Sequence, residues 1–384
     1  MRRWVFSLVI ILVTLLMCEG VLQVAKLLSR PARRLLMPSW EVGDLTITDV
    51  RLGRRGNPDH LEHDARGYRN KEALSRSDVV VLGDSHAYGA GVGREEAWPT
   101  LLGAYNMALP SYGPVQSLLQ LPEALSLKPR KIIVSVYIGN DFFDVFAMSQ
   151  RLPRMAYSYS SPEVIHAAEE AERRAPFFST VRQRFAPGDI PPPAPNGLRA
   201  WISRHVALYG LARAALEYLH PAPRSALLSR NFAVARDALT PSQRLRVIPV
   251  EAETWKTLLT PAYRQTAMDD NDPRIRLGVQ GVHWSLIEIA RRCHEHGVQL
   301  VVVLLPTKES VFHPRLRPPL PELDRLWADE QRLGRDLLRT LHRNDIRAID
   351  ALASLQMAAR QPYFEDVDGH PNASGHRIIA DLLR

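Results

Sequence analysis

Cysteine is almost absent from this chain, which has only Cys18 and Cys293 among its 384 residues. A fold held by disulfide bonds needs several pairs, so the composition excludes a disulfide scaffold. The chain also lacks an internal repeat and a basic patch with interleaved aromatic residues in its body, which argues against solenoids and against nucleic-acid binding. His294-Glu295-His296 looks like a metal motif, but histidines two positions apart do not share a helix face. We therefore expect no metal and no other cofactor.

The excess of positive charge is confined to one end of the chain. The formal net charge is +8. Residues 1–55 hold nine Lys and Arg against four acidic residues, a net of +5, which leaves +3 for the remainder. Basic residues concentrated beside an apolar segment favour contact with anionic lipid headgroups.

The longest uncharged apolar run lies at the N-terminus. It extends from Trp4 to Cys18 and continues from Val21 to Ala25, with Glu19 and Gln23 as the interruptions. About 20 apolar residues are enough for one membrane-spanning helix. No small-x-small cleavage site follows, so we predict an uncleaved signal anchor, with a cleaved signal peptide as the alternative.

The orientation of this anchor has two readings. Four basic residues follow the apolar run and two precede it, and this loop charge alone would keep the body in the cytoplasm. Long domains, however, translocate largely regardless of charge. We therefore expect an anchor in the inner membrane with the folded body in the periplasm.

The rest of the chain divides into a linker and one large domain. Residues 29–75 contain several prolines and glycines and predict an irregular polar stalk. Residues 76–384 form the predicted domain, with a helical and proline-rich insertion at about 146–275. This insertion is either a lid over the ligand edge of the sheet or a separate domain.

Strands and helices alternate on both sides of the insertion. Helical patterns separate short apolar runs, which is typical of an α/β fold with a parallel sheet and helices on both faces. The predicted strands are 79–82, 105–109, 131–137, 299–305 and 346–350.

Polar residues that can carry out acyl transfer follow these strands. Ser85 comes directly after the first strand, and Asp368 and His370 lie on the loop before the last helix. Gly113 and Asn140 follow two further strands and can supply oxyanion donors. Because the carboxyl ends of parallel strands open on one side of a sheet, these segments are expected to converge. His86 and His376 compete with His370 for the role of base, and we favour His370.

These segments resemble, in order and rough position, the four blocks of the SGNH (GDSL) hydrolase superfamily. The blocks are Gly83-Asp84-Ser85, Gly113, Gly139-Asn140-Asp141 and Asp368-x-His370-Pro371-Asn372. The resemblance implies a flavodoxin-like three-layer α/β/α fold and a catalytic pair of Ser85 and His370, with Asp368 orienting the imidazole. It also implies an oxyanion hole made by the Ser85 N–H, the Gly113 N–H and the Asn140 side chain.

One departure leaves the reaction open. Hydrolases of this superfamily usually carry Asp three residues before His, where this chain has Val367. Asp368 lies two residues before His370, as in relatives that O-acetylate exopolysaccharides such as alginate, although there the Asp-x-His block precedes the serine block. The segment Leu305–Phe312 also resembles part of those acetyltransferases.

We therefore expect a serine esterase acting on an O-acyl, in the favoured case O-acetyl, group of an extracytoplasmic glycan. The alternatives are an O-acetyltransferase that modifies such a glycan, with envelope or polysaccharide-export proteins as partners, and a non-catalytic glycan-binding protein. A lipase would need an exposed apolar face on the insertion, which its Arg- and Glu-rich stretches do not indicate. Substrate contacts are predicted for His86, Lys308 and Asp141.

Overall fold

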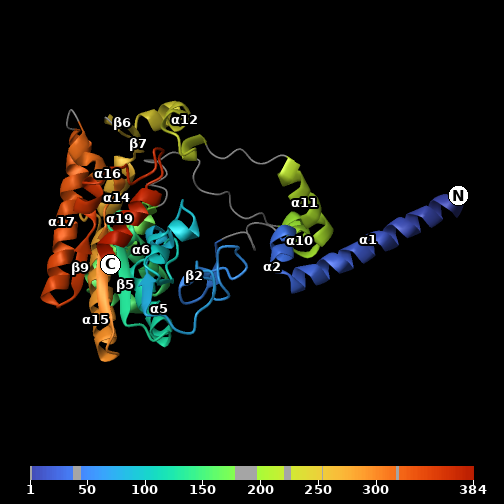
Figure 1. Cartoon of the computed structure of the whole chain (residues 1–384), viewed down its shortest axis with the longest axis horizontal. Helices are drawn as coiled ribbons and strands as arrows, with labels where there is room; N and C mark the ends of the chain where they lie inside the picture. Colours follow the sequence, from blue (N-terminus) through green and yellow to red (C-terminus); the bar gives the residue numbers. More distant parts are fainter. Residues whose placement is uncertain (1, 38–44, 178–196, 220–225, 253, 317–319) are drawn as a thin grey trace. The chain divides into compact units, whose positions relative to one another are not determined.

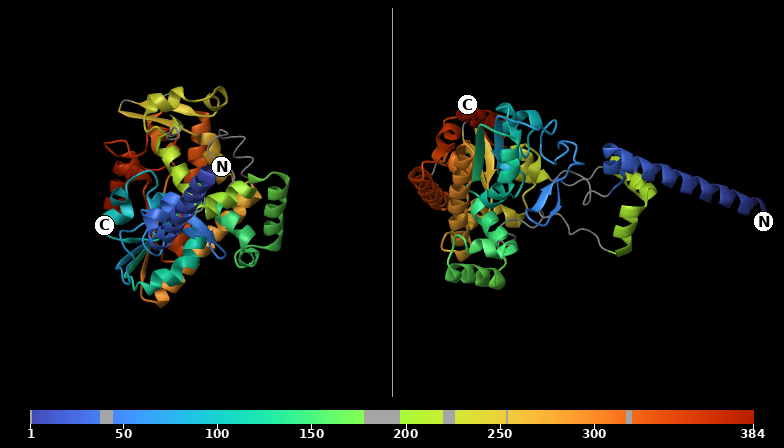
Figure 2. Two further views of the ribbon diagram at one scale, coloured as in Figure 1. Left: turned by 90° about the vertical axis from the view of Figure 1, so that its right-hand side faces the viewer. Right: turned by 90° about the horizontal axis from the view of Figure 1, so that it is seen from below.

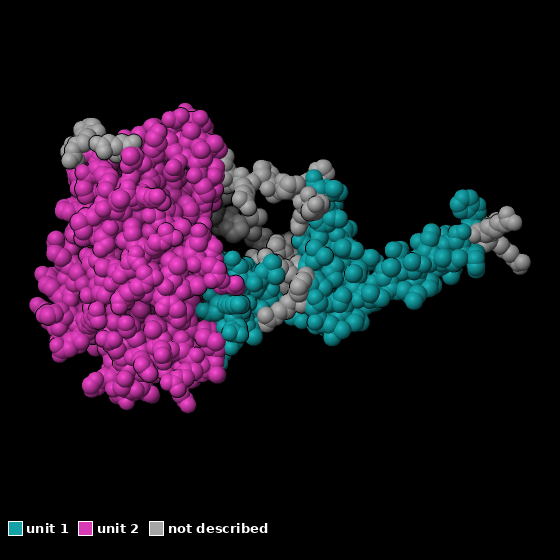
Figure 3. All heavy atoms as spheres, viewed as in Figure 1, with its two compact units in different colours: residues 1–50, 54–73, 190–223 teal, residues 51–53, 74–189, 224–384 magenta. Residues whose placement is uncertain are grey.

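The computed structural model describes the chain except for residues 1, 38–44, 178–196, 220–225, 253 and 317–319. It contains two compact units, coloured separately in Figure 3. Unit 1 comprises residues 1–50, 54–73 and 190–223, and unit 2 comprises residues 51–53, 74–189 and 224–384. The predicted insertion is therefore divided between the two units.

Unit 2 is built on a five-stranded sheet in which every neighbouring pair is parallel. The strand order is β4-β3-β5-β8-β9, which is the 2-1-3-4-5 order of flavodoxin-like folds. The predicted fold class is confirmed, and the strands fall within one residue of the predicted starts. They are β3 (Val79–Leu82), β4 (Tyr105–Asn106), β5 (Lys131–Tyr137), β8 (Gln299–Leu305) and β9 (Arg347–Asp350).

Helices cover both faces of this sheet (Figure 1). On one face, α5 (Pro114–Ser126), α15 (Pro273–Glu295) and α17 (Pro321–Arg343) pack in series. On the other, α4 (Trp98–Leu101) packs against α19 (Ala373–Leu383). The helices are divided between the two faces because the crossovers between parallel strands are right-handed. From β3 to β4 the chain moves toward one edge of the sheet, and from β4 onward it moves toward the other edge, so the connecting helices change face.

The central strands are almost entirely apolar because both of their faces are covered. In β3, Val80, Val81 and Leu82 have no exposed surface, and β5 and β8 are buried except at their first residue. A parallel sheet buried on both sides selects continuous β-branched and aliphatic residues. The turns that follow these strands are therefore the places where polar residues can lie.

The insertion contributes further elements to unit 2. Before the undescribed stretch, which contains the predicted proline-rich segment 186–195, the chain forms three helices. Beyond it lie two short helices, an antiparallel hairpin that the sequence analysis did not predict, and a further helix. In order they are α6 (Asp141–Arg151), α7 (Pro153–Ala156), α8 (Pro162–Arg174), α12 (Phe232–Asp237), α13 (Pro241–Arg244), β6 (Ile248–Ala252), β7 (Trp255–Leu259) and α14 (Pro261–Met268).

The helices that the structure describes in unit 1 pack on one another (Figure 2). They are α1 (Arg2–Leu28), α2 (Arg30–Leu36), α10 (Gly197–His205) and α11 (Ala207–Leu219). The prediction of an irregular stalk at 29–75 was wrong, because this stretch contains α2 and the strands β1 (Thr46–Asp49) and β2 (Gly53–Gly56). In α2, Pro31 occupies the first turn, where a missing N–H costs nothing, and the Ser29 hydroxyl caps the helix.

One helix among the described residues is long and apolar enough to cross a membrane. It runs from Trp4 to Leu28 with a mean hydropathy of 2.6. A membrane anchor and a signal sequence both meet this description, so the apolar segment is as predicted while its orientation stays a prediction.

Candidate active site

Three side chains from the two ends of unit 2 form one chain of hydrogen bonds. The Ser85 Oγ lies 2.8 Å from the His370 Nε2, and the His370 Nδ1 lies 2.6 Å from the Asp368 Oδ1. Ser85 begins the short helix α3 (Ser85–Tyr88) after β3, and the other two residues precede α19. Ser85 and His370 are half-buried, so the pair that would react is open to a substrate.

The turn that holds Ser85 requires the glycine before it. Gly83 has a φ of +153°, and a Cβ there would lie 2.0 Å from the Ser135 Oγ. The Asp84 carboxylate accepts a hydrogen bond from the His86 N–H at 3.0 Å and so caps α3. The strand therefore turns sharply into a helix, and the serine stands at the carboxyl edge of the sheet with its own N–H at the helix start.

His86 is not placed to meet a substrate, contrary to our expectation. Its side chain is 3% exposed, its Nδ1 lies 3.1 Å from the Asp84 Oδ2, and its ring stacks on Tyr137 with centroids 3.7 Å apart. Burial lowers the pKa of His86, which favours the neutral ring. His86 therefore packs behind His370, whose ring centroid is 4.7 Å away.

Both oxygens of the Asp368 carboxylate are bound. The Oδ1 accepts hydrogen bonds from the Nδ1 and the backbone N–H of His370, and the Oδ2 accepts one from the Arg230 Nη1 at 2.6 Å. Burial alone would raise the pKa of Asp368, but the bonds from His370 and Arg230 hold it well below its ordinary value. Asp368 is therefore ionised and fixed in orientation. Arg230 itself adopts a positive φ of 63° and lies over the Phe364 ring.

Lys308 supports this loop from inside, so its predicted contact with substrate was also wrong. Its side chain is buried, with 1% exposed, and its Nζ donates hydrogen bonds to the carbonyls of Asp366 at 2.7 Å and Asp368 at 2.9 Å. Burial lowers the pKa of Lys308 to about 8. The ammonium group thereby satisfies two buried backbone acceptors directly behind the His370 loop.

The insertion explains why the aspartate stands two residues before the histidine. Val367 lies in a hydrophobic cluster with buried side chains of the insertion, Phe232, Ala235, Leu239, Val247 and Leu258. A carboxylate at position 367 would be buried in that cluster without a partner. The Arg230 N–H also donates to the Asp366 Oδ2 at 2.9 Å, and the Thr257 hydroxyl to the Phe364 carbonyl at 2.9 Å.

The predicted oxyanion donors Gly113 and Asn140 lie at adjacent helix starts, and the single N–H of Gly113 is already engaged. Gly113 caps α5 and Asn140 caps α6, and a Cβ on Gly113 would lie 3.6 Å from the Asp141 carbonyl. The Asn140 Nδ2 donates to the Asp144 Oδ2 at 2.9 Å, which leaves its second N–H for a ligand. The Gly113 N–H, however, donates to the Gln116 Oε1 at 3.1 Å. In this structure the Gln116 side chain occupies the place of an oxyanion at that donor.

Replacing Asn140 by Ala is expected to lower kcat for ester hydrolysis by about 10²–10³, the usual loss for one oxyanion donor. The matched control is Asp144→Ala, which removes the partner of the same amide but keeps the amide itself. We expect it to cost about tenfold at most, because only the orientation of the donor is loosened. Steady-state kinetics with a soluble ester measures both, and an Asn140→Ala variant that equals the control would show that the amide is no donor in the reaction.

Asp141 belongs to the scaffold of this turn. It has no exposed surface, and its Oδ2 accepts a hydrogen bond from the Tyr137 N–H at 3.0 Å. Burial raises the pKa of Asp141 well above its ordinary value. Asp141 therefore holds the end of β5. The prediction that it binds substrate was wrong.

A buried acid that the sequence analysis missed lies beneath the loop after β8. Glu330 of α17 accepts hydrogen bonds from the Thr307 N–H at 2.9 Å, the Thr307 hydroxyl at 2.5 Å and the Ser310 hydroxyl at 2.7 Å. Burial outweighs these bonds and raises the pKa of Glu330 to about 7. On a helix of many charged residues, nothing in the sequence distinguishes this glutamate from a solvated one.

The raised pKa makes the stability of the fold depend on pH. The folded chain holds the Glu330 proton up to about pH 7, whereas the unfolded chain releases it near 4.5. Stability is therefore lost as pH rises from 4.5 through 7, by about 3 kcal/mol in full. A Glu330→Gln variant lacks this loss, so urea unfolding at pH 4.5 and pH 8 should show the wild type losing stability relative to the variant as pH rises. Equal changes in the two proteins would contradict the assignment.

Arg264 of α14 is a second residue that the sequence did not reveal. A Cβ on Gly369 would lie 2.1 Å from the Arg264 Nη2, so the guanidinium runs against the backbone between Asp368 and His370. The Arg264 Nε lies 3.9 Å from the Glu309 Oε2. A side chain at position 369 would therefore have to displace the Arg264 guanidinium.

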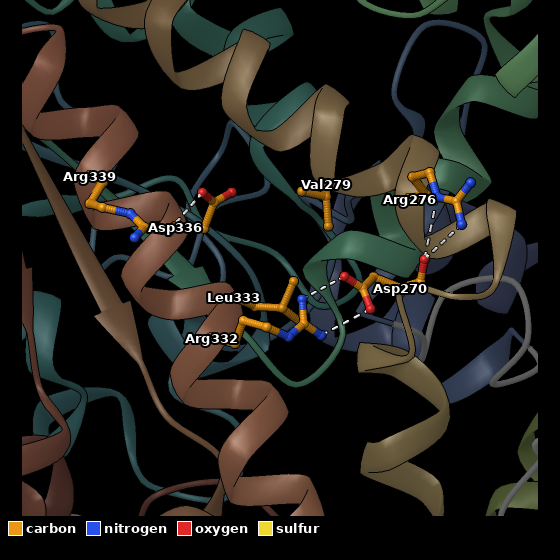
Figure 4. Close-up of a pocket in the computed structure, with 7 residues that line it drawn as sticks. All are labelled: Asp270, Arg276, Val279, Arg332, Leu333, Asp336 and Arg339. Atoms are coloured by element: carbon orange, nitrogen blue, oxygen red, sulfur yellow. Dashed lines mark hydrogen bonds and ion pairs between the residues drawn. The ribbon is translucent and has the colours of Figure 1, made fainter.

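The described residues contain no cluster of His, Cys, Asp and Glu that could hold a metal ion. Figure 4 shows a pocket of about 230 Å³ between α15 and α17, lined by Asp270, Arg276, Val279, Arg332, Leu333, Asp336 and Arg339. There Arg332 pairs with the Asp270 carboxylate, and Arg276 donates to the backbone carbonyl of the same residue. None of the residues that line it belongs to the Ser85 site.

No protein-family model and no curated protein matches this sequence. Among solved structures, the chain is similar to an acetylxylan esterase from Geobacillus stearothermophilus, with 8% identity, a TM-score of 0.35 and coverage of 81% of this chain and 94% of that one. It is similar to a GDSL-like lipase from Bacteroides thetaiotaomicron, with 10% identity, a TM-score of 0.33 and coverage of 79% and 84%. A third is an alpha/beta hydrolase from the metagenome of Lake Arreo, with 10% identity, a TM-score of 0.34 and coverage of 81% and 94%.

Proposed function

We propose that this chain is a membrane-anchored serine esterase of the SGNH type that hydrolyses an O-acyl, in the favoured case O-acetyl, ester on a glycan outside the cytoplasm. The observation that carries the proposal is the unbroken path from the Ser85 Oγ through His370 to the Asp368 carboxylate, at 2.8 and 2.6 Å. A serine, an imidazole and a fixed carboxylate in this order are the parts that acyl transfer requires.

The geometry supports a two-step reaction. The ionised Asp368 accepts the Nδ1–H of His370, so the Nε2 lone pair faces the Ser85 hydroxyl. Ser85 attacks the ester carbonyl while its proton moves to the His370 Nε2, and Asp368 stabilises the imidazolium. His370 returns the proton to the departing sugar oxygen. Water then loses a proton to His370 and attacks the acyl-serine. As the bond between the acyl group and the Ser85 Oγ breaks, His370 returns that proton to the Oγ, and the carboxylic acid leaves.

The proposed glycan substrate and the proposed location outside the cytoplasm are supported by other features. The apolar α1 supports a membrane anchor, and the sequence blocks resemble enzymes that act on O-acyl groups. The Asp-x-His spacing and the segment Leu305–Phe312 favour a second candidate, an O-acetyltransferase in which a sugar hydroxyl takes the place of water. Since the Gly113 N–H is bound to Gln116, a retained scaffold that only binds glycan is the third.

The test uses the full-length chain in detergent with an acetylated polysaccharide, with and without an unacetylated oligosaccharide as acceptor. Esterase activity releases free acetate at the same rate in both mixtures. Acetyl groups that appear on the oligosaccharide would instead establish the transferase. A chain that does neither, and whose Ser85 is not labelled by a fluorophosphonate, would be a binding protein, and the proposal would be abandoned.

A further inference from the structure

Helix α11 of unit 1 carries an apolar stripe with no cover among the described residues. Its exposed positions are Leu211, Ala212, Ala215, Leu216 and Leu219, which recur at the spacing of one helix face. Leu216 and Leu219 are 61% and 68% exposed. This is the apolar face of the insertion that the sequence analysis did not find. A continuous exposed stripe of this kind marks a contact surface.

The opposite face of α11 fixes the helix to the membrane-type helix α1 and to α2. Ala207 and Gly210 are buried, and a Cβ on Gly210 would lie 1.9 Å from the Leu36 carbonyl oxygen, so the backbones of α11 and α2 touch. The Glu19 carboxylate of α1 accepts hydrogen bonds from the N–H groups of Ala207 at 2.8 Å and Leu208 at 2.9 Å. Glu19 is the only acidic residue of α1. An acid in a membrane span is costly unless it is paired, and here the free N–H groups at the start of α11 pair it.

Two further hydrogen bonds show how far along α1 the junction between α10 and α11 lies. The Gln23 Nε2 donates to the His205 carbonyl at 2.7 Å, and the Lys26 Nζ donates to the Arg204 carbonyl at 3.2 Å. At 1.5 Å per residue, Glu19 lies about 22 Å and Lys26 about 33 Å beyond Trp4, in a bilayer whose core is about 30 Å thick. The junction of α10 and α11 is bonded to α1 between these two levels and therefore lies near the boundary between acyl chains and headgroups.

The direction of α11 matches such a boundary. In Figures 1 and 2, α11 runs across the axis of α1, so a spanning α1 leaves α11 parallel to the membrane plane. Trp201 of α10 is 55% exposed, and tryptophan is enriched at membrane interfaces. From these observations we infer that α11 is an interfacial helix, whose stripe of Leu211, Leu216 and Leu219 is buried in the acyl chains of the bilayer that α1 crosses.

This inference rests on the proposed anchor and not on the proposed chemistry. Its occupant is lipid because the helix is bonded to a span whose own apolar side chains are exposed along its length. The consequence for the protein is a second attachment, because residues 207–219 come from the middle of the insertion. The chain would then be held to the bilayer both at its N-terminus and within the insertion.

The test measures contact with lipid at single positions in the full-length chain. Cys18 and Cys293 are replaced by Ser and Ala, and one cysteine is introduced by Leu216→Cys, labelled with the fluorophore NBD and reconstituted in phosphatidylcholine–phosphatidylglycerol vesicles. Lipids brominated on their acyl chains quench only a fluorophore that touches them. Val13→Cys on α1, 48% exposed, reports the span, and Leu245→Cys in unit 2, 87% exposed, is the matched exposed leucine.

We expect quenching at position 216 within about twofold of that at position 13, and none at position 245. If lipid quenches the fluorophore at position 13 while iodide in the water quenches the one at position 216, the inference about α11 is overturned and the anchor is kept. Protection of 216 from both quenchers, with crosslinking between copies or without it, would show that protein covers the stripe and would also overturn it. An unquenched position 13 would remove the anchor itself, and the inference with it, whatever the esterase assay shows.

Discussion

Replacing Ser85 by Ala is expected to abolish ester hydrolysis, with kcat falling on the order of 10⁶-fold. The His370→Ala variant is expected to lose about as much of kcat. The two losses coincide because the Ser85 Oγ and the His370 Nε2, 2.8 Å apart, share one proton and neither acts without the other. For the same reason the double variant is expected to be no worse than either single one. Hydrolysis of a soluble nitrophenyl ester by the full-length chain measures all three.

Two exposed residues provide the controls. Ser126→Ala and His294→Ala remove the same functional groups from the surface of unit 2, far along the sequence from the site, and are expected to leave kcat within about twofold. Thermal unfolding of every variant must stay near that of the wild type. A Ser85→Ala variant that keeps a tenth or more of the activity, with its fold intact, would mean that another residue is the nucleophile.

The sheet could be predicted well from the sequence because a buried strand is marked by a short run of neighbouring apolar residues. Runs such as Lys131–Tyr137 and Gln299–Leu305 are mostly β-branched and aliphatic, and both strands have the bounds that the runs predict. The convergence of Ser85 with His370 followed from topology, because loops after parallel strands share one edge. Neither inference needed a side-chain distance.

The residues that support the site could not be predicted in this way. Arg230 and Glu330 act through tertiary contacts with partners 20 to 138 positions away, and each looks in the sequence like an ordinary surface charge. Lys308 and Asp141 were predicted to meet substrate because they follow strands, yet both are turned inward to satisfy backbone groups. A polar residue at a strand end can thus serve the loop as readily as the ligand, and only burial separates the two.

The grouping of α11 with α1 was hidden for the same reason. The insertion shows helical patterns but no sign of its partner, and the hydrogen bonds of Glu19 reach 188 and 189 positions along the chain. Glu19 had appeared only as an interruption of an apolar run. Its carboxylate caps a helix that begins beyond the undescribed stretch, which no pattern in the first 28 residues could indicate.

Asp368→Asn is expected to lower kcat by about 10⁴, the second-largest loss, because the amide orients the imidazole in the wrong tautomer. In the wild type the Asp368 Oδ2 accepts from Arg230 and the Oδ1 accepts from His370. An asparagine has only one carbonyl oxygen, for which Arg230 on one side competes with the two N–H groups of His370 on the other. The guanidinium of Arg230 is always protonated, so it takes that oxygen and leaves the NH₂ facing the His370 Nδ1. The Nε2 then carries the proton and cannot accept one from Ser85.

If Arg230 and His370 compete for the amide oxygen of residue 368, removing Arg230 should restore activity. A merely structural loss would give no such rescue. Removing Arg230 in the Asp368→Asn background frees the amide to turn its oxygen toward the Nδ1–H and backbone N–H of His370, which both point at one position in the wild type. The double variant Asp368→Asn, Arg230→Gln should therefore recover about tenfold of kcat over Asp368→Asn alone, whereas Arg230→Gln in the wild-type background should lower it. Arg236→Gln, on the same insertion but paired with Asp237 and Glu251, is the matched control and should rescue nothing. Additive losses would contradict this account, because they would mean that Arg230 braces the loop without choosing the orientation of residue 368.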